Sequence, residues 1–350
     1  MMKRILFPLV IFLAACSGKE NSAVQTVDLA EVPVQEVKFE VLPLDTSKVI
    51  YPKGILVWND HLILATPKED NLFSFWDRNT LYYQFSTTIK GQGPDDISSL
   101  DPSYMKASDN SIFVLDDNTE VEMILEGNRL KSIKRTPIII GDAVNGFSTF
   151  KVDEKSYITL GVSYKIDSEH YKYDGENVVK FGTFPALVSD ETAGEDMVVQ
   201  YNHKISVGMP GKKVFFNFYD MLNLIREYDI DGNLLKEIKV SGALQKENTY
   251  SMFLDNQEKP CTPYWYYASA TDKYICVMFY KGQTMTEIIK MYKETILPEM
   301  ELQVWDWDGN LKKRYTFDRA FSNFTVAEDG TMYAFNSYEG DAIYRFKVFD

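Results

Sequence analysis

Histidine and cysteine are scarce in this chain of 350 residues, which has only three of each. His61, His170 and His203 lie far apart in the sequence and show no spacing typical of a metal site. No serine or cysteine stands beside them as a marked nucleophile. We therefore expect core or surface histidines, no metal, no cofactor and no catalytic residues.

Basic residues are too few to balance the acidic ones. The chain has 37 Lys and Arg against 51 Asp and Glu, for a formal net charge of −14. An excess of negative charge repels phosphate backbones and anionic surfaces. The composition therefore argues against nucleic acid as a partner.

The apolar run at the N-terminus is too short to span a membrane. Residues 5–15 are apolar and follow Lys3 and Arg4, as in a secretory signal peptide. The run ends Leu-Ala-Ala before Cys16, which resembles the lipobox of bacterial lipoproteins. We predict a signal peptide at residues 1–15 and a lipid anchor on Cys16. The alternative is an ordinary signal peptide with an incidental cysteine.

Residues 16–35 are predicted to be a flexible tether. They are polar, lack aromatic side chains and show no sustained period, so they need not pack. Ser17 after the anchor cysteine favours the outer membrane. Lys19 and Glu20 faintly resemble the export signal of surface lipoproteins, so the periplasmic side and the cell surface both remain open.

Turn signals, in contrast, are abundant and regular. Residues 305–315 read as a strand, a tight Asp-Gly-Asn turn and a returning strand, flanked by alternating apolar residues. A close copy of this pattern occurs at residues 228–235, and three looser copies occur at residues 76–81, 125–130 and 173–178. Hairpins repeated at intervals of roughly 50 to 75 residues indicate a radial repeat.

A second signal, a polar turn entering an apolar strand, recurs six times. Its copies lie at residues 59–64, 109–114, 153–158, 211–216, 271–276 and 328–333. With the hairpins they predict an all-β fold over residues 36–350, a six-bladed propeller of four-stranded antiparallel blades. The last blade lacks a fourth strand, and we predict that residues 37–42 complete it.

The loop at residues 90–96 has the sequence Lys-Gly-Gln-Gly-Pro-Asp-Asp, which points to a particular family of propellers. With six blades and a lipobox, the chain resembles the TolB-like six-bladed propeller lipoproteins. This resemblance implies a periplasmic or surface binding scaffold. The loop lacks the Lys-Ser/Thr and the helix of a phosphate site. We interpret it as a tight inter-blade crossing in which Asp95 and Asp96 bind backbone groups.

Other motifs have plain structural interpretations. The turns that begin at Asp229 and Asp306 imitate a calcium loop, but position 12 is Val240 or Phe317 where a glutamate is needed. Cys261 and Cys276 either pair as a disulfide or stay free, with Cys276 buried in a strand.

Long insertions should gather on one face of the ring. They are residues 185–199, 241–263 and 281–300. The last contains a predicted helix at 284–292, capped by Thr284 and lying over the channel mouth. On this face we predict ligand-binding residues that combine aromatic and charged side chains, namely Tyr219, Asp220, Tyr264, Trp265, Lys281, Tyr338 and Glu339. The alternative is that the aromatic residues pack beneath the loops.

The sequence thus predicts a membrane-anchored propeller that binds a protein, peptide or carbohydrate without catalysis. A propeller hydrolase or lyase that acts on sugars or lactones at the end of the channel is the second hypothesis.

Overall fold

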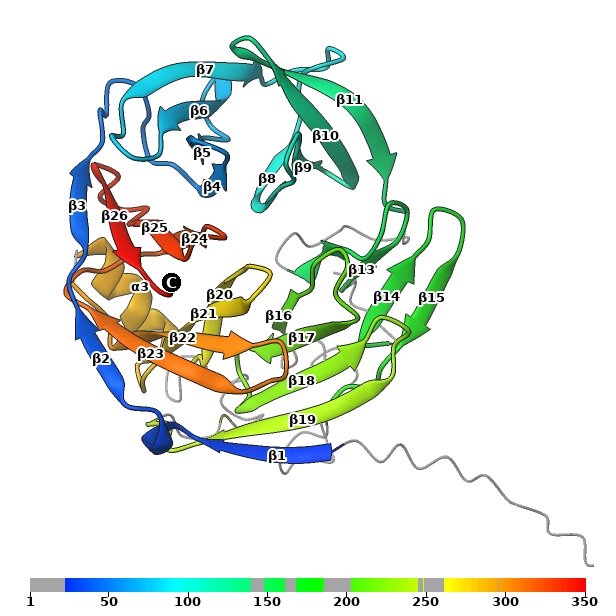
Figure 1. Cartoon of the computed structure of the whole chain (residues 1–350), viewed down its shortest axis with the longest axis vertical. Coiled ribbons are helices and arrows are strands. Elements are labelled where there is room, and N and C mark those ends of the chain that lie inside the picture. Colours follow the sequence, from blue (N-terminus) through cyan, green and yellow to red (C-terminus); the bar gives the residue numbers. More distant parts are fainter. Residues whose placement is uncertain are drawn as a thin grey trace, which may run out of the picture.

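The chain forms a ring of six blades around a central axis (Figure 1). The computed structural model describes residues 23–139, 148–160, 168–185, 203–244, 248, 261–294 and 296–350. The predicted all-β six-bladed propeller is therefore confirmed.

Each blade is a twisted antiparallel sheet whose first strand lies nearest the axis. Blades 1 to 3 contain β4 (Gly54–Trp58) to β7 (Tyr83–Ile89), β8 (Leu100–Ala107) to β11 (Arg129–Pro137), and β12 (Phe150–Lys151) to β15 (Val178–Phe181). Blades 4 and 5 contain β16 (Lys204–Val207) to β19 (Leu234–Ser241) and β20 (Trp265–Ala270) to β23 (Leu311–Phe317). Blade 6 contains β24 (Asn323–Val326), β25 (Thr331–Phe335), β26 (Ala342–Lys347) and β3 (Glu40–Pro43).

The repeated sequence signals occupy equivalent places in the blades. The six polar turns precede the second strands β5 (His61–Ala65), β9 (Ile112–Asp116), β13 (Tyr157–Thr159), β17 (Val214–Tyr219), β21 (Tyr274–Tyr280) and β25. The five hairpins join the third strands β6 (Asn71–Asp77), β10 (Thr119–Glu126), β14 (His170–Tyr173), β18 (Leu224–Asp229) and β22 (Met300–Asp306) to the fourth. All hairpins therefore project from one face, which we call the hairpin face.

The N-terminal segment closes the ring, as predicted, but it does more than close it. β3 pairs antiparallel with β26, with Tyr344 opposite Val41. Val37 belongs instead to β2 (Val34–Val37), which runs parallel to β23 on blade 5. β1 (Ala23–Asp28) likewise runs parallel to β19 on blade 4. The described part of the expected tether, residues 23–35, is thus a belt across the outer edges of blades 4 and 5, because free strand edges there offer hydrogen bonds to a polar chain.

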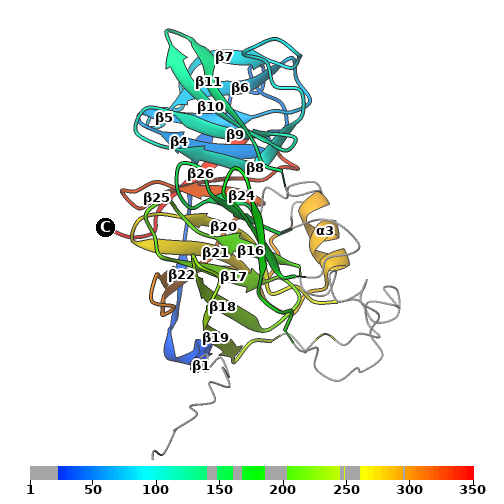
Figure 2. The same cartoon turned by 90° about the vertical axis from the view of Figure 1, so that its right-hand side faces the viewer.

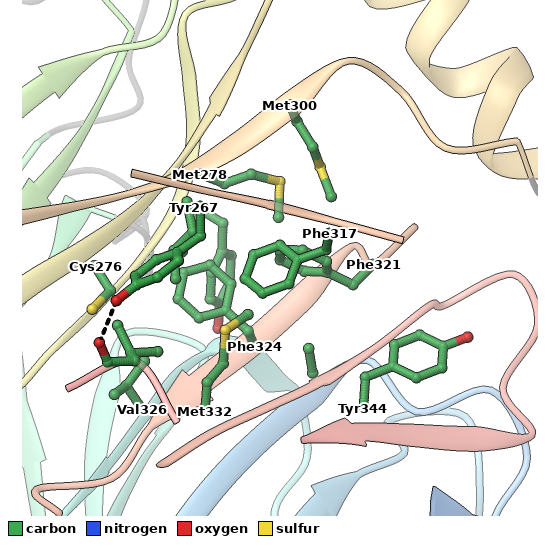
Figure 3. Packing of buried hydrophobic residues seen from close by; sticks show 14 of the residues in the cluster. Tyr267, Cys276, Met278, Met300, Phe317, Phe321, Phe324, Val326, Met332 and Tyr344 are labelled. Atoms are coloured by element: carbon green, nitrogen blue, oxygen red, sulfur yellow. Dashed lines mark hydrogen bonds between the residues drawn. The ribbon is translucent and has the colours of Figure 1, made fainter. Parts of the chain in front are cut away.

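The core consists of six apolar clusters, one between each pair of neighbouring blades. The cluster between blades 5 and 6 is rich in aromatic and sulfur-containing side chains (Figure 3). Cys276 lies in it, within β21. Counted over the described residues, the clusters on either side of blade 3 are the smallest, and buried polar networks accompany both.

The face opposite the hairpins carries α3 (Met285–Lys293), as Figure 2 shows. We call it the loop face. Thr284 and Glu287 form a capping box at the start of α3, so the predicted helix and its cap are confirmed. Of the other insertions, residues 186–199, 245–247 and 249–260 lie outside the described residues. None of the described helices is long and apolar enough to cross a membrane.

Candidate functional site

Four tyrosines meet on the loop face where blades 5 and 6 adjoin. We call Tyr266, Tyr280, Tyr292 and Tyr338 the tyrosine cluster. The Tyr266 and Tyr280 rings lie 6.0 Å apart, and the Tyr292 and Tyr338 rings stack at 6.1 Å. Burial and the neighbouring Tyr338 raise the pKa of Tyr266. Tyr266 and Tyr338 keep 40% and 43% of their surface exposed, so two aromatic faces are open to solvent.

Regular elements hold the cluster in place. Tyr292 lies on the buried side of α3, and its hydroxyl donates to the carbonyl oxygen of Phe321 at 2.7 Å. The same hydroxyl lies 3.1 Å from that of Tyr280 on β21. α3 therefore covers the junction of blades 5 and 6, away from the centre of the ring (Figure 1). The prediction that this helix lies over the channel mouth was wrong, because its apolar side packs into the inter-blade cluster.

The three other aromatic residues predicted to bind ligand are buried. Trp265 is 0% exposed, and its indole N–H donates to Gln303 at 3.1 Å. Tyr264 and Tyr219 are equally inaccessible. Alternation along β20 turns Trp265 and Tyr267 inward and Tyr266 outward, so the exposed aromatic residue is one position beyond the predicted one.

The predicted charged residues all have partners within the fold. Lys281 lies 3.5 Å from Glu301, a fully buried carboxylate that also binds the guanidinium of Arg314 at 2.7 Å. Glu339 accepts a hydrogen bond of 2.6 Å from the hydroxyl of Tyr344. Of the seven predicted residues, Tyr338 alone presents a large exposed surface, and Glu339 follows it in the chain.

A histidine–aspartate pair lies at the loop-face end of blade 4. His203 Nδ1 is 2.8 Å from Asp220 Oδ2, and 47% of the His203 side chain is exposed. Its hydrogen bond to Asp220 raises the pKa of His203, while burial opposes the rise. Asp220 was predicted, but His203 was expected to be only a core or surface histidine. The pairing across β16 and β17, invisible in the sequence, brings the two together.

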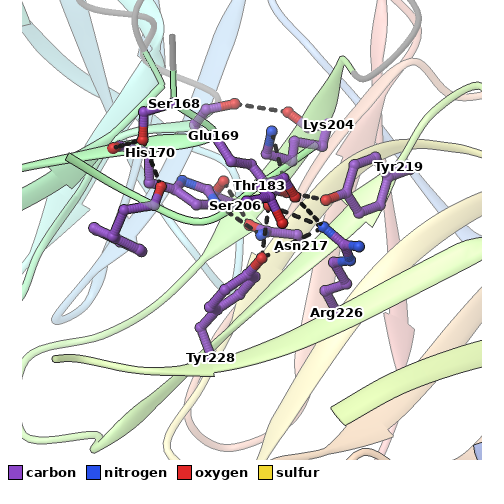
Figure 4. A network of polar contacts seen from close by, with 12 residues as sticks. Ser168, Glu169, His170, Thr183, Lys204, Ser206, Asn217, Tyr219, Arg226 and Tyr228 are labelled. Atoms are coloured by element: carbon purple, nitrogen blue, oxygen red, sulfur yellow. Dashed lines mark hydrogen bonds and ion pairs between the residues drawn. The ribbon is translucent and has the colours of Figure 1, made fainter. Parts of the chain in front are cut away.

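The densest group of charges is sealed between blades 3 and 4 (Figure 4). Glu169 is 0% exposed and binds Arg226 at 3.1 Å, Lys204 at 3.5 Å and the Tyr228 hydroxyl at 2.6 Å. The Tyr219 hydroxyl donates to the same carboxylate. Burial strongly raises the pKa of Tyr219, so the phenol stays neutral. The network is closed to solvent, and we assign it a structural role.

The remaining motifs are structural. Asp229 Oδ1 accepts from the backbone amides of Asp231 and Asn233 at 3.0 and 2.8 Å, which confirms a hairpin turn in place of a calcium loop. Asp96 and Asp95 accept from the amides of Gly93 and Ser132, as predicted for an inter-blade crossing.

The described residues offer no metal centre and no disulfide. Cys261 and Cys276 are free, and burial raises the pKa of Cys261 to about 11. Within the described ranges, no three His, Cys, Asp or Glu side chains are placed to hold a metal ion. Cys16 lies outside the described residues.

Comparisons with known proteins agree with this architecture. The family model described as "TolB-like 6-blade propeller-like" matches residues 34–329. A comparison with curated protein sequences found no match. A solved structure of a DUF4221 family member from Bacteroides vulgatus is similar, with a TM-score of 0.62 and 11% identity, over 90% of this chain and 97% of that one.

Two solved structures are more distant. Regucalcin from Agrobacterium tumefaciens aligns with a TM-score of 0.44 and 11% identity over 93% of this chain and 96% of its own. Streptogramin B lyase aligns with a TM-score of 0.44 and 9% identity over 88% and 97%. At these identities the likeness concerns the fold alone.

Proposed function

The chain belongs to the TolB-like six-bladed propeller family, and we propose that it is a binding module whose ligand contacts the tyrosine cluster on the loop face. The observation that carries the proposal is the exposure of Tyr266 and Tyr338 on a framework of strands and a capped helix. Aromatic rings with hydroxyl groups recognise sugars and peptides through flat apolar surface and directional hydrogen bonds.

The surroundings of the cluster suit such a ligand. Ile289, on α3, is 41% exposed. Tyr51 is 56% exposed and lies beside Gly340, two residues after Tyr338. A mixed aromatic and aliphatic surface of this kind favours a peptide, a protein loop or a neutral carbohydrate over a strongly charged ligand.

We also propose that a lipid on Cys16 holds the protein at the outer membrane, on its periplasmic side or at the cell surface. The lipobox-like sequence and the family membership support this location. The propeller then acts as a tethered receptor.

The test is binding of arrays of neutral oligosaccharides and of a peptide library to the wild type and to the Tyr266→Ala/Tyr338→Ala variant. We expect the variant to lose at least about 2 kcal/mol of binding free energy for the ligand found, with an unchanged melting temperature. Tyr82→Ala is the matched control, because Tyr82 is 76% exposed at the blade 1 hairpin on the other face. Equal binding by the double variant and the wild type, or no binding in either array, would refute the proposal.

The His203–Asp220 pair supports a second candidate, a hydrolase or lyase that acts on sugars or lactones. An aspartate on Nδ1 orients a histidine whose Nε2 is then free to move a proton. Turnover of a panel of sugar lactones that is abolished by His203→Asn would favour the enzyme. Absence of turnover by the wild type would leave the binding module as the proposed function.

A further inference from the structure

A pocket of about 410 Å³ opens on the hairpin face where blade 6 meets blade 1. Its walls are the β6–β7 hairpin, the turn between β24 and β25, the end of β26 and the start of β3. The volume falls within the range of small-molecule sites, about 300 to 1,000 Å³. The pocket lies on the face opposite the tyrosine cluster, so it is a separate site.

Positive charge is concentrated in this pocket although the whole chain carries −14. Four cationic side chains face two carboxylates, which leaves an excess of two positive charges. These six residues are Lys38, Arg78, Arg345, Lys347, Glu40 and Asp329.

The fold itself uses only part of this charge. Arg345 binds Glu40 through Nε and Nη2, both at 2.8 Å, and Arg78 binds Asp329 through Nη2 at 2.9 Å. Lys347 donates to a backbone carbonyl, and Lys38 and Lys347 form no ion pair with any described residue. Lys347 lies near the Asp329 carboxylate, whose pKa it helps to lower, and shares it with Arg78. The exposed ammonium group of Lys38 has no carboxylate partner among the described residues.

Arg78, which lines the pocket, also has one unused donor. Arg78 Nε is buried and has no hydrogen-bond acceptor among the described residues. A buried donor without an acceptor is unfavourable, and a ligand oxygen would satisfy it only if the Arg78 side chain turned toward the pocket. Tyr333 and Phe346 add apolar wall beside the charged groups.

We propose that this pocket binds the carboxylate or phosphate group of a small soluble anion. Lys38 and Lys347 supply the charge that attracts the anion, and Arg78, held in place by Asp329, adds a third cation in the pocket wall. The Arg345–Glu40 pair, which joins β26 to β3, forms the floor and holds the closing strand beside the ligand.

The test is calorimetric titration of the complete chain with D-glucuronate, inorganic phosphate and, as the matched neutral sugar, D-glucose. We expect at least one anion to bind and glucose not to bind, with affinity that falls as salt is added. Tighter binding of phosphate assigns the pocket to phosphoryl groups, and tighter binding of glucuronate assigns it to carboxylates.

Charge-removing variants locate the binding. Lys38→Gln and Lys347→Gln should each weaken the anion about tenfold, because a hydrogen bond to a charged group is lost. Lys273→Gln is the control, since Lys273 is exposed on the hairpin face in blade 5, outside the pocket. The Lys38 variant tests the proposal even if Lys347→Gln unfolds. Failure of both anions to bind, equal binding of glucose and glucuronate, or equal affinity of Lys38→Gln and the wild type would overturn it.

Discussion

Single residues at the blade 3–blade 4 junction show how much of this fold depends on buried charge. Glu169 is one of 51 acidic residues, and nothing in the sequence distinguishes it from a solvent-exposed carboxylate. Its role comes from Lys204 and Arg226, residues 35 and 57 positions away that reach it only when the blades pack. This network therefore adds buried, directional contacts between the two blades to the apolar packing of the junction.

Glu169→Gln should destabilise the fold by about 3 to 5 kcal/mol, because Lys204 and Arg226 would keep their burial and lose their counter-charge. Chemical denaturation measures the change. Glu237→Gln is the matched control: Glu237 binds the same guanidinium at 2.7 Å but its side chain is 24% exposed. We expect less than about 1 kcal/mol there. Similar losses in both variants would contradict the assigned role.

Stability should also fall on acidification in two pH windows. Burial lowers the pKa of His170 to about 3. Between about pH 6.5 and 3 the unfolded chain therefore binds a proton at His170 that the folded chain does not bind, and stability falls. Burial alone would raise the pKa of Glu169, but Lys204, His170 and Arg226 bring it to about 2, which adds a loss between about pH 4.5 and 2. In each window the unfolded state binds more protons, so the melting temperature should drop with pH.

His170→Phe separates the two windows. Phe181 stacks on His170 at 5.1 Å, so an aromatic replacement fits its surroundings. The variant loses the hydrogen bond to Asn217 at every pH. This loss lowers the melting temperature by a constant amount and does not change its slope against pH. We expect a flatter melting-temperature profile between about pH 6.5 and 3, the interval between the unfolded and folded pKa values of His170. The fall that remains below about pH 4.5 is then that of Glu169. An unchanged slope in the upper window would exclude His170 as its cause.

At the scale of elements, local chemistry predicted most strands and turns. Asp-Gly-Asn turns and apolar alternation are short-range signals, so the hairpins, the second strands and α3 could be found from the sequence. The exposed residue at the site was missed because side chains alternate along β20, so an error of one position exchanges the buried Trp265 for the exposed Tyr266. The bulge between Trp265 and Ala268 makes the register of this strand still harder to predict. The belt escaped prediction for another reason: β1 and β2 are polar strands held by edges far away in the sequence.

A comparison of Gly232→Ala with Gly127→Ala should show how the cost of replacing a hairpin glycine divides between backbone strain and steric crowding. Both glycines have positive φ, +97° and +61°. A Cβ on Gly127 would meet no atom within 4 Å, so the cost is that of the backbone alone, about 1 to 2 kcal/mol. A Cβ on Gly232 would lie 2.7 Å from the Phe181 ring of blade 3. We expect a clearly larger loss of unfolding free energy for Gly232→Ala. Equal losses in the two variants would show that the Phe181 ring moves aside at no measurable cost.

At the scale of the whole molecule, the ring depends on one strand more than on any other. Blade 6 has three strands of its own, and β3 supplies the fourth from the far end of the chain. β1 is different, because blade 4 already has four strands without it. Blades 1 to 3 show that a four-stranded blade needs no added outer strand.

Deletion of residues 36–43 should therefore prevent folding of the entire propeller, since it opens the ring and exposes a radial edge. Size-exclusion chromatography should show aggregates. Removal of β1 alone, residues 23–28, should leave a monomer with a modestly lower melting temperature. A monomeric 36–43 deletion with an unchanged melting curve would rule out this closure.

The belt also determines which face a lipid anchor would bring near the membrane. Ala23 pairs with Lys236, two residues into β19, at the end next to the blade 4 hairpin. Seven residue steps separate Cys16 from Ala23, which span at most ~25 Å when fully extended. A lipid on Cys16 would keep the hairpin end of blade 4 near the bilayer, so the tyrosine cluster on the loop face would point away from it.

Cys16→Ala should release the protein from the membrane fraction, and mass spectrometry of the membrane-bound wild type should find acyl chains on Cys16. A dye placed by Lys273→Cys on the hairpin face should then be quenched by lipid-borne quenchers more strongly than one placed by Ile289→Cys on α3. Both positions are exposed, so labelling itself is matched. An unmodified Cys16 on membrane-bound protein would end the anchor hypothesis. Equal quenching at the two positions would show that the tether, despite its short reach, leaves the propeller free to turn.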